Sequence, residues 1–347
     1  MSDLQKSPVM EIRNLKLDFH SDGKVLRAVD GVSFAIYPGE TLCLVGESGS
    51  GKSVTALAIA QLTPARHAGG EILIEGRNVV KMSKPELRAV RGRIISYVFQ
   101  EPSASLNPVF RAGSQIREAL KLHRPEAASD AEVVRLLKLV GIPAPELRMR
   151  DYPHQLSGGM QQRVMIAMAL ASQPKLLIAD EPTTALDVTI QAQIIELLAD
   201  LKQRLNMSML LITHNLGIVG DIADRVAVMY AGQIIELAPA DQILARPLHP
   251  YTQALINSVP ALGQEAGRLT AIPGVVPNLG AFPSGCRFHP RCLKARRDCP
   301  ERLPELAEVE PGRFVRCFYW NAPLPNAEES LNPYHPALKQ AREPARS

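Results

Sequence analysis

Short runs of apolar and β-branched residues alternate with helical patterns along most of this chain. Strands that are apolar on both faces are predicted at four places: Thr41 to Val45, Lys175 to Ala179, Met209 to Thr213 and Arg225 to Met229. Strands of this kind, separated by helices, are typical of a parallel sheet that helices cover on both sides. The pattern therefore predicts an α/β fold.

Two helices are readable from the 3.6-residue period. The segment Ile190 to Leu205 repeats apolar residues at spacings of three and four, so that one face can pack against the sheet. A second helix begins at a capping box formed by Ser129 and Glu132 and ends at Gly141. We assign it to a helical insertion over about residues 101–174.

The texture of the chain changes from Pro239 onward. This last third holds 16 of the 28 prolines and four of the five cysteines. We therefore expect two domains, a core over residues 1–240 and an irregular, cysteine-rich C-terminal module over residues 241–347.

Composition narrows the class of protein. The chain has 347 residues, 46% of them hydrophobic and 21% charged, which suits a folded protein with a large core. A net charge of +4 is too small to indicate a nucleic-acid partner. The longest apolar run, Val164 to Ala171, is too short to span a membrane. The start of the sequence lacks the features of a secretory signal, so we expect a cytosolic location and reduced thiols.

A phosphate-binding loop directly follows the first predicted strand and precedes a helical segment. Its glycines let backbone N–H groups converge on phosphate oxygens at a helix N-terminus. In such a loop the lysine reaches the β- and γ-phosphates, and the serine after it is a ligand of Mg²⁺. The loop and its first helical residue are Gly46, Glu47, Ser48, Gly49, Ser50, Gly51, Lys52, Ser53 and Val54.

Further polar groups follow downstream. Ser157 is placed to cap an apolar helix that runs to about Ala171, and an exposed helix start attracts phosphate. Asp180 and Glu181 end the predicted strand before them, at the sheet edge where α/β folds bind ligands. Asp180 can hold Mg²⁺ through its water shell, and Glu181 can orient or deprotonate a water molecule. His214 ends another strand at the same edge.

The order of these motifs resembles the nucleotide-binding domain of ABC ATPases over about residues 8–240. The resemblance implies a RecA-like P-loop NTPase core with a helical signature subdomain, which binds ATP and Mg²⁺ between two subunits. It also implies roles for single residues: Gln100 as the Q-loop residue that senses Mg²⁺ and the water, Ser157, Gly158, Gly159 and Gln161 as the signature that closes over the ATP of a partner, Asp187 as the D-loop residue, Glu181 as the catalytic base, and His214 as the switch histidine.

Two positions near this motif set call for comment. The family stacks adenine on an aromatic residue near the N-terminus, and Phe19 occupies that place, although it is also a candidate core residue. The usual aspartate after the switch histidine is Asn215 here, which removes a negative charge.

Further segments resemble the ATPase subunits of the peptide and nickel import branch, closest to the dipeptide importers. They are FQEPSASLNP ending at Pro108, YPHQ ending at Gln155, MYAG ending at Gly232 and HPYTQAL ending at Leu255. The resemblance implies dipeptide import across the inner membrane, with the chain peripheral on the cytoplasmic side. It also implies a second, related ATPase as heterodimer partner, two transmembrane permease subunits and a periplasmic binding protein. Oligopeptide or nickel import stays open as an alternative.

The four C-terminal cysteines are Cys286, Cys292, Cys299 and Cys317. Their clustering among Gly, Pro and basic residues suits four thiolate ligands of an iron–sulfur cluster or of Zn²⁺. The family resemblance favours a [4Fe-4S] cluster. Cys43, by contrast, lies in the strand before the phosphate loop and is expected to be a core thiol.

ABC ATPases that do not transport solutes form the alternative of a different class. DNA-repair members place hundreds of coiled-coil residues between the phosphate loop and the signature, whereas Lys52 and Ser157 are about a hundred positions apart. Translation factors usually carry two cassettes in a chain, and this sequence has one. A module that binds without hydrolysis would have lost Glu181 or His214, and both are present.

Overall fold

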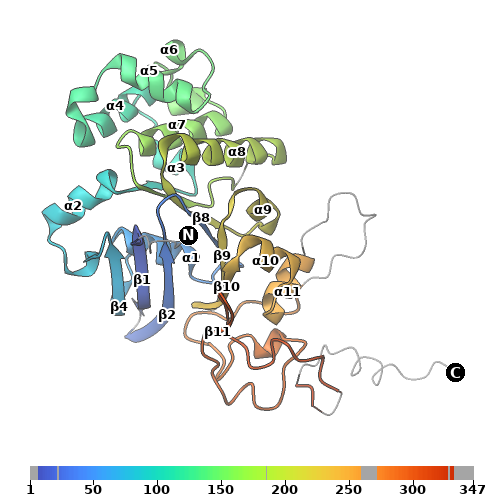
Figure 1. Cartoon of the computed structure of the whole chain (residues 1–347). Coiled ribbons are helices and arrows are strands. Elements are labelled where there is room, and N and C mark those ends of the chain that lie inside the picture. The colour runs from blue at the N-terminus through green and yellow to red at the C-terminus, as the bar shows by residue number, and fades with distance from the viewer. Residues whose placement is uncertain (1–6, 22, 185, 259–271, 327–328, 332–347) are drawn as a thin grey trace, which may run out of the picture.

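The computed structural model describes residues 7–21, 23–184, 186–258, 272–326 and 329–331. The described residues form two sheets, a group of helices at one end and an irregular region at the other (Figure 1).

The main sheet has eight strands in the order β11-β12-β10-β9-β3-β8-β7-β6. Five neighbouring strands, β9, β3, β8, β7 and β6, run parallel, and β10, β12 and β11 continue the sheet beyond β9 as antiparallel strands. The bounds are β3 Thr41–Val45, β6 Ile95–Val98, β7 Leu176–Asp180, β8 Ser208–Thr213, β9 Arg225–Tyr230, β10 Gln233–Pro239, β11 Ala307–Glu310 and β12 Arg313–Val315. The four predicted strands are thus confirmed, with ends that differ by at most one residue.

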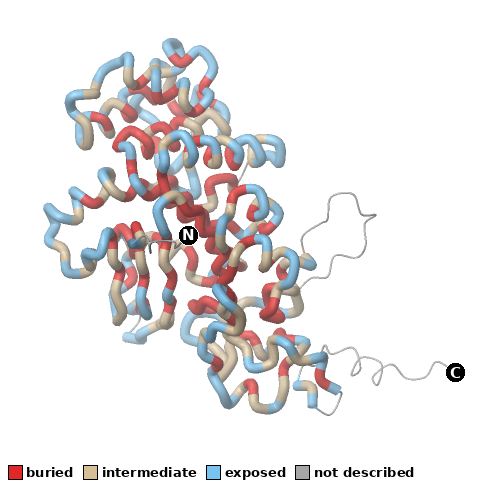
Figure 2. Tube along the Cα trace, viewed as in Figure 1, coloured by how far each residue is buried: buried red, intermediate tan, exposed pale blue. Residues whose placement is uncertain are grey.

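Alternate residues of these strands enter two separate cores, because successive side chains of a strand point to opposite faces. In β3, Cys43 and Val45 belong to one buried cluster, while Leu42 and Leu44 belong to the other. Both faces of the sheet are therefore covered, as the apolar runs predicted (Figure 2).

The second sheet is antiparallel and has the order β2-β1-β4-β5. Its strands are β1 Met10–Ser21, β2 Lys24–Ile36, β4 Arg66–Ile74 and β5 Arg77–Asn78. The sequence analysis did not predict this sheet, since β1 and β2 mix buried with exposed positions and are interrupted by irregular pairing. Its buried residues complete the core on one face of the main sheet.

The helices surround the main sheet and extend beyond it. They are α1 Lys52–Ile59, α2 Lys84–Arg93, α3 Pro102–Ser105, α4 Ala112–His123, α5 Asp130–Leu139, α6 Pro145–Arg148, α7 Gly158–Leu170, α8 Val188–Leu205, α9 Val219–Ile222, α10 Ala240–Ala245 and α11 Pro250–Asn257. Helices α4 to α7 gather above the sheets as a helical subdomain, shown in green in Figure 1. These helices lie within the stretch of about residues 101–174 for which the sequence predicts a helical insertion, and the bounds of that insertion stay a prediction.

Helix α5 begins where its cap predicts. The Ser129 hydroxyl accepts a hydrogen bond from the backbone N–H of Glu132 at 3.3 Å. The reciprocal half of the capping box is missing, because the Glu132 carboxylate pairs with Arg124 and Arg135 instead. Gly141 follows the helix with a φ of 72°, a conformation that favours glycine.

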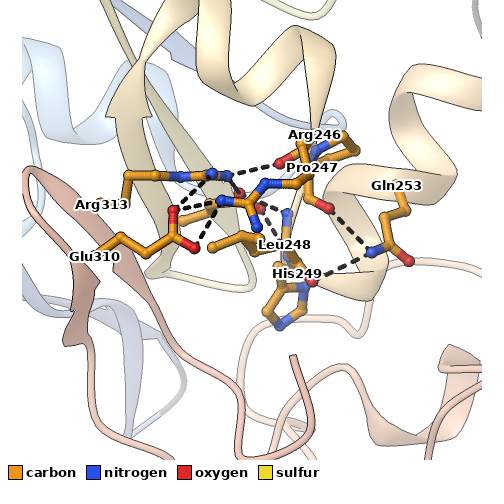
Figure 3. A network of polar contacts seen from close by, with 8 residues as sticks. Arg246, Pro247, Leu248, His249, Gln253, Glu310 and Arg313 are labelled. Carbon is orange, nitrogen blue, oxygen red and sulfur yellow. Dashed lines mark hydrogen bonds and ion pairs between the residues drawn. The ribbon is translucent and has the colours of Figure 1, made fainter. Parts of the chain in front are cut away.

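The C-terminal residues are attached to the edge of the main sheet. The buried Glu236 carboxylate in β10 accepts N–H bonds from Leu248 and His249, each at 2.8 Å. Arg313 of β12 donates to the carbonyl of Arg246 and to Glu310, which also pairs with the Arg246 side chain (Figure 3). Strand β10 lies before residue 240 and pairs with β12, which lies after it, so both predicted domains contribute to one sheet. The boundary between residues 240 and 241 stays a prediction.

Among the helices that the structure describes, none is long and apolar enough to cross a membrane.

Candidate nucleotide site

The phosphate-binding loop connects β3 to α1 and can be built only with glycine at two positions. Gly46 has a φ of 154°, and a Cβ there would lie 2.2 Å from the carbonyl oxygen of Met229. Gly51 caps α1 with a φ of 105°, and its Cβ would lie 2.8 Å from the Met229 side chain. The loop therefore packs directly against β9, with its N–H groups at the start of a helix.

Lys52 is buried inside this loop. Its ammonium group donates to the carbonyl oxygens of Gly46 and Glu47 at 2.8 and 2.9 Å. Burial lowers the pKa of Lys52, while Glu181, Asp180 and Glu47 nearby raise it. An ammonium has three N–H donors, so one remains for a phosphate oxygen.

Asp180 ends β7 and faces the loop. Its two carboxylate oxygens accept hydrogen bonds from the Ser53 hydroxyl and from the Tyr97 hydroxyl, both at 3.0 Å. Burial raises the pKa of Asp180, and the two hydrogen bonds lower it. Ser53 and Asp180, which were both predicted as Mg²⁺ ligands, thus lie side by side.

Three side chains converge on one carboxylate oxygen of Glu181. The Gln100 amide donates to Oε2 at 3.2 Å, the Thr184 hydroxyl donates at 2.9 Å, and Nδ1 of His214 lies at 3.2 Å. The backbone of Glu181 has a φ of 45°, a left-handed conformation that costs energy and that clusters at functional sites. The side chain of His214 is 60% exposed and that of Glu181 only 14%.

A cavity of about 840 Å³ joins these groups. From the phosphate loop it is lined by Glu47, Ser48, Gly49, Gly51, Lys52, Ser53 and Val54, and from the hydrolytic side by Gln100, Glu181 and His214. Gly46 and the fully buried Ser50 lie beneath the loop surface. An acid next to a lysine, a serine and backbone N–H groups can position a water against a bound phosphate.

The signature residues lie apart from this cavity. Ser157 is exposed and caps α7 through its hydroxyl, which accepts from the N–H of Met160 at 3.4 Å. Gly159 packs against Ile190, and the side-chain amide of Gln161 donates to two backbone carbonyls of the loop before α7. No described signature residue lines the cavity, so this chain's own signature does not cover its own phosphate loop.

Three other predicted residues have local partners. Asp187 is exposed and caps α8 by accepting from the N–H of Ile190 at 3.0 Å. Asn215 caps the short turn after His214 by accepting from the N–H of Gly217. Phe19 packs partly buried against the core and is not among the cavity residues, so adenine stacking stays a prediction.

Sequence reasoning missed several residues of the site. Thr184 stands three positions after Glu181 without belonging to a motif that we used, and Tyr97 lies in β6, which was not predicted. Residues far along the chain also line the cavity: Leu255, Gly274, Val275 and Val276. No periodic signal marks these last positions, because they lie in irregular loops or near a helix end.

The four C-terminal cysteines are close enough to influence one another's charge. Burial raises the pKa of Cys286 to about 11 and of Cys317 to about 12, and it raises that of Cys292 well above its ordinary value, with further increases from neighbouring thiols. The sulfur of Cys299 accepts the N–H of Arg296 at 3.3 Å. As placed, no three His, Cys, Asp or Glu side chains of the described ranges are grouped as a metal site.

Two family models match different parts of the chain. Residues 29–184 match the model described as ABC transporter, and residues 235–299 match that described as oligopeptide/dipeptide transporter, C-terminal region. The first match contains the phosphate loop and the signature. The second begins in β10 and reaches Cys299.

Similar proteins match over nearly their whole length. The oligopeptide transport ATP-binding protein AppD of Bacillus subtilis is 49% identical, over 90% of this chain and 97% of that protein. The oligopeptide transport ATP-binding protein OppD of the same organism is 48% identical, over 92% and 91%. A dimeric ATP-binding cassette solved in a post-hydrolysis state with ADP and Pi is 28% identical, with a TM-score of 0.60 over 67% of this chain and 98% of that one.

Proposed function

This chain belongs to the family of ATP-binding proteins of peptide-importing ABC transporters, and on that premise we propose that it hydrolyses ATP to energise the import of peptides. One observation carries the hydrolytic part of the proposal: Gln100, Thr184 and His214 all meet the Glu181 carboxylate beside the phosphate loop.

The residues of the cavity have separate tasks. Lys52 and the loop N–H groups bind the phosphates, and Ser53 with Asp180 would hold Mg²⁺, which would supply positive charge against the phosphates when bound. Glu181 accepts a proton from the attacking water, while Gln100 and Thr184 keep its carboxylate oriented. The exposed His214 is free to turn from Glu181 to the γ-phosphate.

A second ATPase subunit completes the site in this proposal. Ser157, Gly158 and Gly159 start a helix whose N–H groups suit phosphate, yet they lie away from the chain's own cavity. A partner's signature would therefore cover this chain's ATP, and this chain's signature would cover the partner's. A related but different chain as partner follows from the family resemblance.

The same proposal assigns the remaining partners and the location. The chain would lie on the cytoplasmic side of the inner membrane, beneath two permease subunits served by a periplasmic binding protein. The apolar side chains of Phe99, Val109 and Phe110 are exposed after β6 and offer a surface for the permeases. Dipeptides are the proposed cargo, and the names of the two Bacillus relatives support longer peptides as well.

The four C-terminal thiols are proposed to hold a [4Fe-4S] cluster, with Zn²⁺ as the alternative. The support for this proposal is the donor set: three of the thiols raise the pKa of the fourth, Cys292, and backbone N–H groups are directed at the sulfurs of Cys299 and Cys317. Anaerobically purified Cys292→Ser should lose iron and sulfide, whereas Cys43→Ala, which alters a buried thiol of β3, should keep both. Zinc without sulfide in the wild type would contradict the cluster.

Reconstitution tests the proposed activity. The chain is assembled with its second ATPase and permeases in proteoliposomes, and ATP hydrolysis is measured with a binding protein loaded with a dipeptide, a pentapeptide or nickel. Peptide-loaded binding protein should raise turnover. Stimulation by nickel alone would contradict peptide cargo while leaving ATP hydrolysis in place.

A further inference from the structure

Glu47 is the second residue of the phosphate loop, and its carboxylate forms an ion pair with Arg291 of the C-terminal residues. The two terminal nitrogens of Arg291 donate to the two carboxylate oxygens of Glu47 at 2.8 and 3.0 Å, across 244 positions of sequence. The Arg291 side chain is 5% exposed and that of Glu47 is 29% exposed. A bidentate pair with one buried partner is among the stronger ion pairs in proteins.

The same guanidinium also fixes the chain that borders the cavity. Its Nε donates to the carbonyl oxygen of Pro273 at 2.7 Å, and Nη2 lies 3.4 Å from that of Gly274. The next residues, Val275 and Val276, line the cavity together with the phosphate loop. Val275 is 83% exposed at the rim of this cavity.

A second contact joins the same parts of the molecule. The hydroxyl of the fully buried Tyr251 accepts a hydrogen bond from the Glu47 backbone N–H at 2.9 Å. The Tyr251 ring packs on the Tyr230 ring, and the Arg291 guanidinium lies 5.7 Å from the centre of the Tyr230 ring. Both the backbone and the side chain of Glu47 are therefore held by residues of the C-terminal part.

The negative charge of Glu47 makes its pairing with Arg291 important for phosphate binding. The cavity must accept the phosphates of ATP, and a carboxylate at its wall repels them. Burial lowers the pKa of Arg291, but its hydrogen bonds to Glu47 and Tyr230 raise it overall, so the guanidinium stays charged. Arg291 thus neutralises the acid where phosphate binds and directs the carboxylate toward the C-terminal residues.

We propose that Arg291 is a positioning residue of the nucleotide site: by neutralising Glu47 and holding residues 273–276, it makes the C-terminal part of the chain a wall of the ATP cavity. This inference rests on the proposed ATP-binding function. It adds that the affinity for MgATP depends on a contact outside the matched ABC transporter region.

A double-mutant cycle tests this with the purified full-length chain. The affinity for MgATP is measured by displacement of a fluorescent ATP analogue from wild type, Arg291→Met, Glu47→Gln and the double variant. Arg291→Met should bind MgATP about tenfold more weakly, because it leaves the Glu47 charge unpaired. The double variant should recover most of that loss, since no acid remains to repel phosphate. Arg291→Lys keeps the positive charge but cannot make the bidentate contact, so its affinity for MgATP should lie between those of wild type and Arg291→Met.

Arg313→Ala is the matched control. Arg313 is equally buried and also anchors C-terminal residues, but it contacts Glu310 and Arg246 rather than the phosphate loop. An equal loss of affinity in Arg313→Ala and Arg291→Met would overturn the proposal, since general loosening would then explain both. Unchanged affinity in Arg291→Met, or an equal loss in the double variant, would overturn it as well. A wild type that fails to bind MgATP would instead contradict the proposed function.

Discussion

The hydroxyl of Ser53 lies 3.0 Å from the carboxylate of Asp180, although 127 positions of sequence separate the two residues. The fold brings them together because β3 and β7 flank β8 in the sheet, with their carboxyl ends at one edge. Each is an oxygen ligand of the kind that Mg²⁺ prefers, and Tyr97 holds the other carboxylate oxygen of Asp180.

Asp180→Asn tests this pairing. The amide keeps the shape and can still bond to Ser53 and Tyr97, but it removes the negative charge that attracts Mg²⁺. We expect ATP binding in EDTA to change little, while the gain in affinity on adding Mg²⁺ falls about tenfold. Titration of ATP with and without Mg²⁺ measures both. A full Mg²⁺ effect in the variant would remove Asp180 from the metal site.

Glu181→Gln should separate binding from hydrolysis. The loop and the Mg²⁺ ligands survive, but the attacking water loses its base, so turnover of the assembled transporter should fall about 100- to 10,000-fold. Glu196→Gln, an exposed acid of α8, is the control and should hydrolyse ATP at the wild-type rate. Steady-state phosphate release gives the comparison. Hydrolysis that persists in Glu181→Gln would refute the role of the base.

Thr184→Val tests a residue that the motifs did not reveal. Valine has nearly the same shape but cannot donate to the Glu181 carboxylate as the threonine hydroxyl does at 2.9 Å. Loss of one orienting hydrogen bond should lower turnover about tenfold with little change in MgATP affinity. A fall in affinity without a fall in turnover would place Thr184 in nucleotide binding instead.

His249 makes stability depend on pH. Burial, together with the nearby charge of Arg316, lowers the pKa of His249 to about 3. In the unfolded chain this histidine takes up its proton near pH 6.5. The contribution of neutral His249 to the free energy of unfolding is therefore fully present above that pH and is lost as the pH falls toward 3. His249→Asn retains a side chain able to cap α11 but does not titrate. Denaturant unfolding at pH 7 and pH 5 should show wild type losing up to about 2 kcal/mol more than the variant; equal losses would contradict the linkage.

The sequence predicted the parts of the site that lie in continuous patterns. The loop from Gly46 to Ser53 follows an apolar strand and starts a helix, and the pair Asp180 and Glu181 ends another apolar strand. Such elements are defined by residues a few positions apart. Their meeting at one sheet edge follows from the general geometry of parallel sheets.

The parts of the fold and of the site that the sequence did not predict depend on weak local patterns or on contacts between distant segments. Arg291 lies in a short turn among prolines and cysteines, and nothing local indicates that it meets Glu47. Strands β1 and β2 escaped prediction because half-exposed strands with irregular pairing lack the apolar run that marked the central strands. Tyr97 was missed for a related reason, since β6 is only four residues long.

Peptide uptake by whole cells tests the central claim most directly. Cells that carry Lys52→Ala at the chromosomal locus are compared with wild type for uptake of a radiolabelled dipeptide, a longer peptide and nickel. Because Lys52 is needed to bind phosphate, the variant should lose peptide uptake and keep nickel uptake. Undiminished uptake of both peptides would contradict the conclusion that ATP hydrolysis by this chain drives peptide import.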